Sequence, residues 1–275
     1  MNILQSIILG IVEGLTEFLP VSSTGHLTIA ERLLGLPIDD AGVTAFTAVV
    51  QFGAIVAVLL HFRRDLLGLA RAGLAGLGSA AARDTAEWRW SWAIVAGSIP
   101  IGIVGLAAKP LIEGPLRNLW VVGLALIAWS FVMLAAERVH AATADPAAGV
   151  PVDPTARQIF TVGLWQCVAL IPGVSRSGAS ISGGLFLGLD RVTATRLSFL
   201  LSIPALTGAG LLELKDALAG GVGIVPTLVG TAVAFAVAYA SIAWLLRFVA
   251  HHSIAAFVPY RVALGTVVLA ALVAG

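Results

Sequence analysis

The chain has 275 residues, of which 59% are hydrophobic and only 11% are charged, against about 25% charged residues in ordinary soluble domains. This balance leaves too little charge to cover a water-soluble surface, and it excludes a cytosolic globular enzyme and a disordered chain. A net charge of +1 provides no basic surface for nucleic acid, and a lone cysteine, Cys167, excludes a disulfide scaffold. The composition predicts an all-α polytopic membrane protein.

The N-terminal half begins with an apolar stretch, Ile3–Leu36, that is interrupted by LPVSSTGH at Leu19–His26. Proline removes a backbone donor, and Gly and Ser favour turns, so two helices separated by a break are expected. Irregular backbone at membrane depth persists only inside protein or beside water, which predicts a re-entrant hairpin. Three runs then follow that are long enough to span a bilayer as helices: Ala41–Phe62, Ser91–Ala108 and Asn118–Ala136.

The C-terminal half has the same order after a Pro/Ala/Asp-rich segment, Glu137–Pro154. A second interrupted stretch, Ile159–Leu189, carries IPGVSRSGAS at Ile171–Ser180 and is also expected to be a re-entrant hairpin. Three apolar runs follow it: Leu197–Leu212, Ala217–Leu246 and Val262–Gly275. The expected organisation is one membrane domain with repeat 1 at 1–136, a linker at 137–158 and repeat 2 at 159–275.

An internal repeat supports this division, because a shift of 153 residues places Val21–Gly25 on Val174–Gly178. Each half then contains one broken hairpin and three membrane spans. An odd number of spans inverts the second half relative to the first, so the two hairpins enter from opposite faces. Their breaks are expected to meet near the midplane, which is the inverted-repeat geometry of transporters.

Loop charges predict the orientation of the chain in the membrane. The segment Arg63–Trp90 contains five arginines and is expected to be a cytoplasmic loop. The short loop with Asp39 and Asp40 has no basic residue and is expected on the outer side. The linker between the halves is then cytoplasmic, and the C-terminus lies outside.

Two acidic residues, Glu13 and Glu17, lie inside the first apolar stretch. Their i, i+4 spacing puts both carboxylates on one helix face. A charge at membrane depth must pair, bind a cation or face water. The two residues are therefore candidates for metal binding or acid–base chemistry, and a solvated structural pair near a helix end is the alternative.

A polar cluster follows these carboxylates, and its members are Ser22, Ser23, Thr24, Gly25 and His26. Free N–H groups at the start of a helix, together with hydroxyls and an imidazole, favour binding of an anion. The alternative is a cluster that only caps the helix.

The second interruption contributes Arg176, which is flanked by Ser175 and Ser177, with Ser180 one turn further on. The planar guanidinium group of arginine matches two phosphate oxygens at once. The alternative is an intramembrane salt bridge from Arg176 to Glu13 or Glu17. Both interpretations hold if the substrate displaces that salt bridge.

These segments resemble a known family. GIVEGLTEFLPVSSTGH at Gly10–His26 and PGVSRSGAS at Pro172–Ser180 are similar to the two signature regions of the bacterial undecaprenyl-diphosphate phosphatase family, which is associated with bacitracin resistance. The resemblance covers essentially the whole chain. One departure is Ser180, which stands where the family has threonine and which retains the hydroxyl group.

The resemblance implies an enzyme of the bacterial plasma (inner) membrane with an active site facing the outer, periplasmic side. It implies hydrolysis of the C55 isoprenoid diphosphate to the monophosphate, which recycles the lipid carrier of cell-wall synthesis. It also implies a divalent cation, Mg²⁺ or Ca²⁺, a homodimer, and competition from bacitracin, which binds the substrate. No nucleic-acid partner is expected.

The candidate catalytic residues are Glu17, Ser23, His26 and Arg176, and the candidate metal ligands are Glu13 and Glu17. The candidate substrate-binding residues are Ser22, Thr24, Gly25, Ser175, Ser177 and Ser180. The residues leave open whether Ser23 attacks phosphorus or whether His26 or a glutamate activates a water, and the resemblance favours Ser23 with His26.

The rival function is a lipid flippase or an ion-coupled transporter, since inverted repeats with broken helices at a charged midplane site usually indicate alternating access. The hydroxyl groups, the histidine and the arginine favour hydrolysis, because carrying a solute requires neither a nucleophile nor a general acid.

Overall fold

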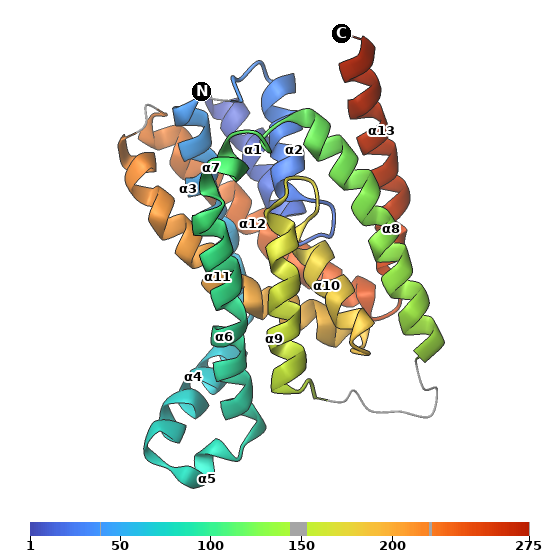
Figure 1. Ribbon diagram of the computed structural model, residues 1–275. Helices are drawn as coiled ribbons and strands as arrows, with labels where there is room; N and C mark the ends of the chain where they lie inside the picture. The colour runs from blue at the N-terminus through green and yellow to red at the C-terminus, as the bar shows by residue number, and fades with distance from the viewer. Residues whose placement is uncertain (39, 144–152, 220–221, 275) are drawn as a thin grey trace.

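The computed structural model describes residues 1–38, 40–143, 153–219 and 222–274, and within these ranges every regular element is helical (Figure 1). The elements of the first half are α1 (Ile3–Thr16), α2 (Ser23–Leu33), α3 (Ala41–His61), α4 (Arg63–Gly78), α5 (Ala80–Arg83), α6 (Ala86–Ala107), α7 (Lys109–Glu113) and α8 (Leu119–Thr143). Those of the second half are α9 (Ala156–Trp165), η1 (Gln166–Leu170), α10 (Arg176–Phe186), α11 (Arg191–Ala219), α12 (Ile224–Val249), η2 (Ile254–Phe257) and α13 (Val258–Ala274).

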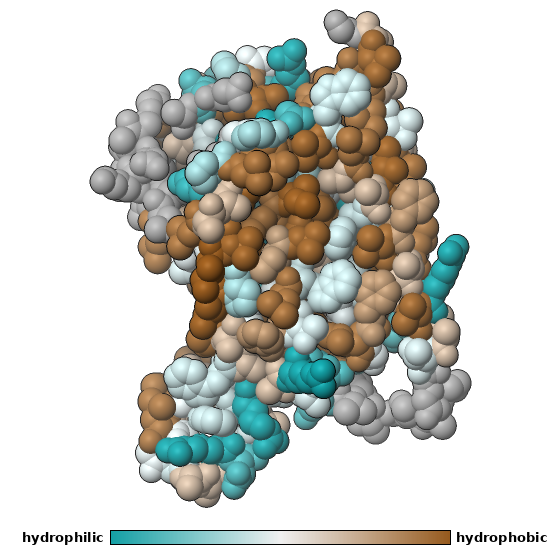
Figure 2. All heavy atoms as spheres, viewed as in Figure 1, coloured by the Kyte–Doolittle hydropathy of each residue, from teal (hydrophilic) through white to brown (hydrophobic). Residues whose placement is uncertain are grey.

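Six segments of the described chain are long and apolar enough to cross a membrane, as predicted. They lie in α3, α6, α8, α11, α12 and the continuous pair η2–α13. Figure 2 shows apolar side chains over the middle of one face, with hydrophilic side chains toward its two ends, including the lower end that holds α4 and α5. The prediction of an all-α polytopic membrane protein is confirmed.

Both interrupted stretches fold as two helices separated by a break. The first break covers residues 17–22 between α1 and α2, and the second break covers residues 171–175 between η1 and α10. In Figure 1 the first pair lies toward the end of the molecule that holds the N-terminus, whereas α9 starts at the opposite end. The two breaks meet in the interior, where Ser177 Oγ donates to the carbonyl oxygen of Leu19.

The same local structure recurs 153 residues further along the chain. Ser22 and Ser175 both have positive φ angles, 76° and 83°, which residues other than glycine rarely adopt. Gln5 and Gln158 both complete capping boxes at the start of their hairpins. This recurrence supports the internal repeat, and the inverted relation of the two halves remains a prediction.

The helix α10 lies in the centre of the bundle, and all its residues from Ser177 to Leu185 are buried. Its small side chains allow this position, because neighbouring helices can approach its backbone closely. A Cβ atom at Gly183 would lie 2.5 Å from the ring of Trp165, so the packing requires glycine there.

Some predicted boundaries were wrong because charged residues were taken as helix ends. The helix α11 starts at Arg191, six residues before the predicted Leu197. Arg191 pairs with Glu137 at 2.7 Å, and Arg196 pairs with Asp65 at 2.6 Å. Since both cations are paired, the helix continues through them.

Two predicted irregular segments also differ. The segment Arg63–Trp90 contains the helices α4 and α5 rather than an open loop. The linker begins later than predicted, because α8 continues to Thr143, and α9 already begins at Ala156. Glu137 remains helical because its carboxylate accepts hydrogen bonds from the Arg191 side chain and from the Ile254 N–H. Residues 144–152 of the predicted linker lie outside the described residues.

Candidate active site

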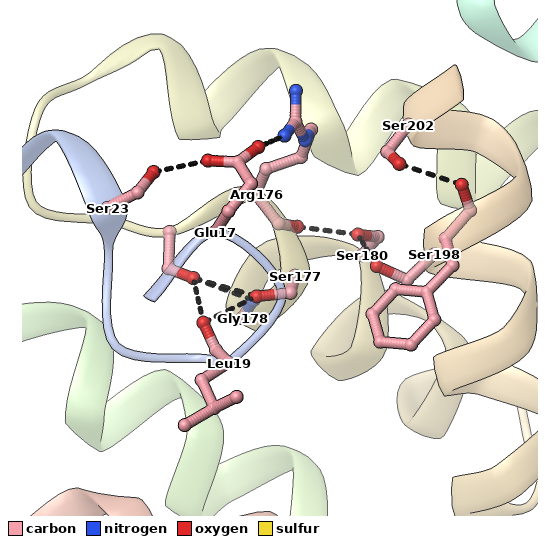
Figure 3. A network of polar contacts seen from close by, with 11 residues as sticks. Glu17, Leu19, Ser23, Arg176, Ser177, Gly178, Ser180, Ser198 and Ser202 are labelled. Atoms are coloured by element: carbon pink, nitrogen blue, oxygen red, sulfur yellow. Dashed lines mark hydrogen bonds and ion pairs between the residues drawn. The ribbon is translucent and has the colours of Figure 1, made fainter. Parts of the chain in front are cut away.

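The centre of the site is the carboxylate of Glu17, which lies at the end of α1 (Figure 3). Ser23 Oγ donates a hydrogen bond of 2.5 Å to Glu17 Oε2. Arg176 Nη2 donates to Glu17 Oε1. Three residues that the sequence singled out therefore come together from the two hairpins, although Arg176 is 159 positions away from Glu17.

A cavity of about 110 Å³ adjoins this group and lies between the two breaks. Glu17, Ser23 and Arg176 line it, and Ser175 borders it as well. Gln51 reaches the cavity from the span α3. The other lining residues are Ser22, Thr24, Ile101, Ala169, Leu170, Pro172 and Gly173. The lining therefore combines hydroxyl groups and one guanidinium, which are donors that bind phosphate oxygens, with one carboxylate, which can accept a proton.

The helices α2 and α10 both start beside this cavity. Ser22 caps α2 by accepting a hydrogen bond from the N–H of Gly25, and Ser175 caps α10 by accepting one from the N–H of Gly178. The first N–H groups of a helix have no partner inside the helix, and they carry its positive dipole end. Two helix starts therefore contribute positive potential to one small cavity.

Two predicted substrate-binding hydroxyls have structural partners instead. Ser177 Oγ bonds the Leu19 carbonyl at 2.9 Å and joins the two breaks. Ser180 Oγ donates to the Arg176 carbonyl at 2.5 Å and contacts Ser198 Oγ at 2.8 Å. Neither side chain lines the cavity, and the predicted Gly25 does not line it either.

His26 lies on α2, and its ring is directed toward α13. Its Nδ1 contacts the carbonyl oxygen of Ser22 at 2.7 Å, and its Nε2 contacts the hydroxyl of Tyr260 at 2.6 Å. Because the Ser22 carbonyl only accepts, Nδ1 carries the proton and Nε2 accepts from Tyr260. His26 does not line the cavity, and the group within hydrogen-bond distance of Ser23 is Glu17.

Glu13 is buried one turn before Glu17 on α1, and within the described chain its Oε1 makes no hydrogen bond. No cluster of three or more His, Cys, Asp or Glu side chains is placed for a metal among the described residues. Mg²⁺ typically uses one or two carboxylates and takes its other ligands from water and phosphate oxygens. The carboxylate oxygens of Glu13 and Glu17 are ligands of the kind that a hard divalent cation prefers. Glu13 does not line the cavity, and both oxygens of Glu17 have hydrogen-bond partners.

Comparison with known proteins identifies the family. A family model described as "Bacitracin resistance protein BacA" matches residues 6–267. The chain belongs to this family. It is 53% identical over 272 residues to Undecaprenyl-diphosphatase 3 of Frankia casuarinae, covering 98% of this chain and 96% of the relative.

Other members of the BacA family match over a similar length. Undecaprenyl-diphosphatase 1 of Streptomyces avermitilis is 53% identical over 277 residues, which is 100% of this chain and 98% of the relative. Undecaprenyl-diphosphatase of Acidothermus cellulolyticus is 50% identical over 276 residues, which is 100% of this chain and 98% of the relative. The similarity therefore includes both hairpins and all six predicted spans.

Two residues at the start of α13 in this BacA family member were not predicted from the sequence. Tyr260 bonds His26, and Arg261 is completely buried between the two breaks. The sixth span was predicted to begin at Val262 because Arg261 was taken as its boundary, whereas α13 begins at Val258. The available signal was a single arginine within an otherwise apolar segment, which indicates a buried and paired charge.

Proposed function

We propose that this protein hydrolyses undecaprenyl diphosphate to undecaprenyl phosphate and inorganic phosphate. The observation that carries the proposal is the carboxylate of Glu17, held between a hydroxyl and a guanidinium beside a polar cavity within the bundle. Full-length relatives named as diphosphatases support the same reaction. A transporter or a flippase is not favoured, because it requires no nucleophile next to a base.

Binding of the diphosphate depends on positive groups around the cavity. Arg176 carries five N–H donors, and within the described chain the one hydrogen bond of its side chain is the bond from Nη2 to Glu17, so the other donors can bind phosphate oxygens. The starts of α2 and α10 supply N–H groups and positive dipole ends for the same oxygens. These groups also offset the negative charge that develops on the leaving phosphate during the reaction.

In the proposed reaction Ser23 is the nucleophile and Glu17 is its base. Ser23 Oγ bonds to the terminal phosphorus, its proton moves to Glu17 Oε2, and the bond from that phosphorus to the bridging oxygen breaks. Undecaprenyl phosphate leaves. Water then attacks the phosphoserine, the bond from phosphorus to Ser23 Oγ breaks, and Glu17 Oε2 returns its proton to that oxygen, which gives inorganic phosphate, free Ser23 and the Glu17 carboxylate. His26, bonded to the Ser22 carbonyl, positions the segment that carries Ser23.

A divalent cation, Mg²⁺ or Ca²⁺, is proposed as the cofactor, with Glu13 and Glu17 as its protein ligands. When bound, such a cation neutralises charge on the diphosphate oxygens and polarises the terminal phosphorus. The support is the carboxylate oxygen of Glu13, which is buried and makes no hydrogen bond within the described chain.

The cellular setting is also a proposal. The substrate is a membrane lipid, so we place the enzyme in the bacterial plasma membrane with its active site open to the periplasmic side. There its product returns to cell-wall synthesis. Bacitracin competes by binding the substrate, and the protein is proposed to form a homodimer.

Purified protein in detergent should release inorganic phosphate from undecaprenyl diphosphate, and EDTA should abolish that release until Mg²⁺ or Ca²⁺ is added back. A colorimetric phosphate assay measures both effects. The matched control is Glu17→Gln, which preserves size but removes the base and a metal ligand, and which should be inactive. Undiminished release in EDTA would contradict the cation, and absence of release from the parent with either metal would contradict the function.

The orientation can be tested with introduced cysteines after Cys167→Ser removes the native thiol. Ser79→Cys, between α4 and α5, and Asp153→Cys, before α9, should resist impermeant thiol reagents in intact cells, because both segments are expected to be cytoplasmic. Pro37→Cys, in the loop between α2 and α3, should be labelled. Labelling at Ser79→Cys and Asp153→Cys, with protection at Pro37→Cys, would reverse the orientation.

A further inference from the structure

The side chain of Arg261 connects the two breaks from inside the bundle. It is completely buried, and Nη1 donates to the carbonyl of Pro20 in the first break at 2.9 Å. Nη2 donates to the carbonyls of Gly173 at 3.0 Å and Val174 at 3.1 Å in the second break. Nε donates to Ser130 Oγ on α8 at 3.2 Å. One guanidinium group therefore holds both irregular segments in place.

All these partners of Arg261 are neutral. Within the described chain no carboxylate lies within ion-pair distance of this guanidinium, unlike Arg176, Arg191 and Arg196. A buried charge is expensive unless hydrogen bonds or an opposite charge compensate for it. Here four hydrogen bonds to backbone and hydroxyl oxygens compensate for it, and a positive charge remains beside a cavity that we assign to an anion.

The bond from Arg261 to the Val174 carbonyl also sets the direction of the next N–H group. A trans peptide is planar, so its N–H points opposite to its C=O. The described chain contains no cis peptide, and the N–H of Ser175 therefore points away from Arg261. This N–H makes no hydrogen bond within the described chain, and Ser175 lines the cavity.

We propose that Arg261 is a positioning residue for phosphoryl transfer. It holds the Val174–Ser175 peptide so that the Ser175 N–H faces the cavity, and it holds Pro20 so that Ser23 stays beside Glu17. The Ser175 N–H then donates to the phosphate oxygen that gains charge in the transition state. This inference rests on the proposed function, because the donor is useful only if an anion reacts in the cavity.

The test compares kcat and KM of Arg261→Lys with those of the parent, per amount of folded protein. Lysine retains the charge but cannot bond three carbonyls in the fixed geometry of arginine. We expect kcat to fall about 10-fold or more with KM within about threefold, since loss of a transition-state donor reduces kcat rather than binding. Size-exclusion chromatography and the Tm in detergent measure the folded protein.

The matched control is Arg191→Ala, which removes an arginine that joins α8 and α11 outside the cavity. Its Tm should fall while kcat of the folded protein stays unchanged. For Arg261→Ala, millimolar guanidinium should raise kcat severalfold, whereas methylammonium, which has no planar set of donors, should not. If guanidinium restored the Tm of Arg261→Ala but not its kcat, the role of Arg261 would be purely structural.

The proposal is overturned if folded Arg261→Lys retains kcat within twofold of the parent. That outcome is distinct from a failure of the proposed function, in which the parent itself releases no phosphate from undecaprenyl diphosphate.

Discussion

Replacing Arg176 with lysine should reduce turnover about 100-fold or more, on the scale of losing one transition-state donor. The charge is retained, but lysine lacks the planar group that binds two phosphate oxygens while it contacts Glu17. Arg176→Ala should be more impaired than Arg176→Lys, because it also leaves the buried Glu17 carboxylate without a cationic partner. Phosphate release under saturating lipid substrate measures kcat for both variants.

Arg196→Lys is the matched control for this prediction. Arg196 is also bonded to an acidic residue, Asp65, but it lies outside the cavity that Arg176 lines. Its turnover should equal that of the parent. If Arg176→Lys also hydrolysed the substrate at a near-normal rate, Arg176 would be only a structural partner of Glu17, and the phosphate-binding role would be wrong.

Ser23→Ala should abolish turnover if Ser23 is the nucleophile, since no phosphoserine can then form. Ser22→Ala should retain much more activity. The Ser22 hydroxyl caps α2 by accepting the N–H of Gly25, and a capping bond stabilises by only about 1 kcal/mol. Single-turnover phosphate release from the two purified variants makes the comparison.

The alternative to the covalent route is direct attack by water. Ser23→Ala would then remove one hydrogen bond to phosphate and leave turnover within about 10³-fold of the parent. A Ser23→Ala protein with a few percent of the parent's turnover would therefore exclude the phosphoserine. Mass-spectrometric detection of phosphorylated Ser23 in acid-quenched parent enzyme would establish it.

The six spans and two hairpins were predictable because their causes are local. Lipid offers no hydrogen bonds to the backbone, so a long apolar run has to be helical. Pro20 and Pro172, with the glycines and serines beside them, interrupt two such runs. The predicted ends of the spans were wrong where a charged residue pairs with a residue far away in the sequence. Arg191 is an example, because its partner Glu137 is 54 positions away.

The residue types of the site were also predictable. A carboxylate pair and an arginine within apolar segments have to find partners. Glu17, Ser23 and Arg176 were all candidates, and the structure brings them into one hydrogen-bonded group. The sequence alone did not determine which residue contacts Ser23, since Glu17 precedes it by six positions and His26 follows it by three.

By itself the sequence determined the helical membrane fold, the two breaks and the chemical character of the site, because hydropathy, turn residues and the cost of buried charge act over a few neighbouring residues. Only the tertiary structure decided which residues the polar side chains of the site contact. Ser22, which has a positive φ, comes directly before α2. On that helix Ser23 contacts Glu17, whereas His26 contacts Tyr260. Arg261 bonds Pro20 across 241 positions, and such a contact exists only once the two halves have packed together.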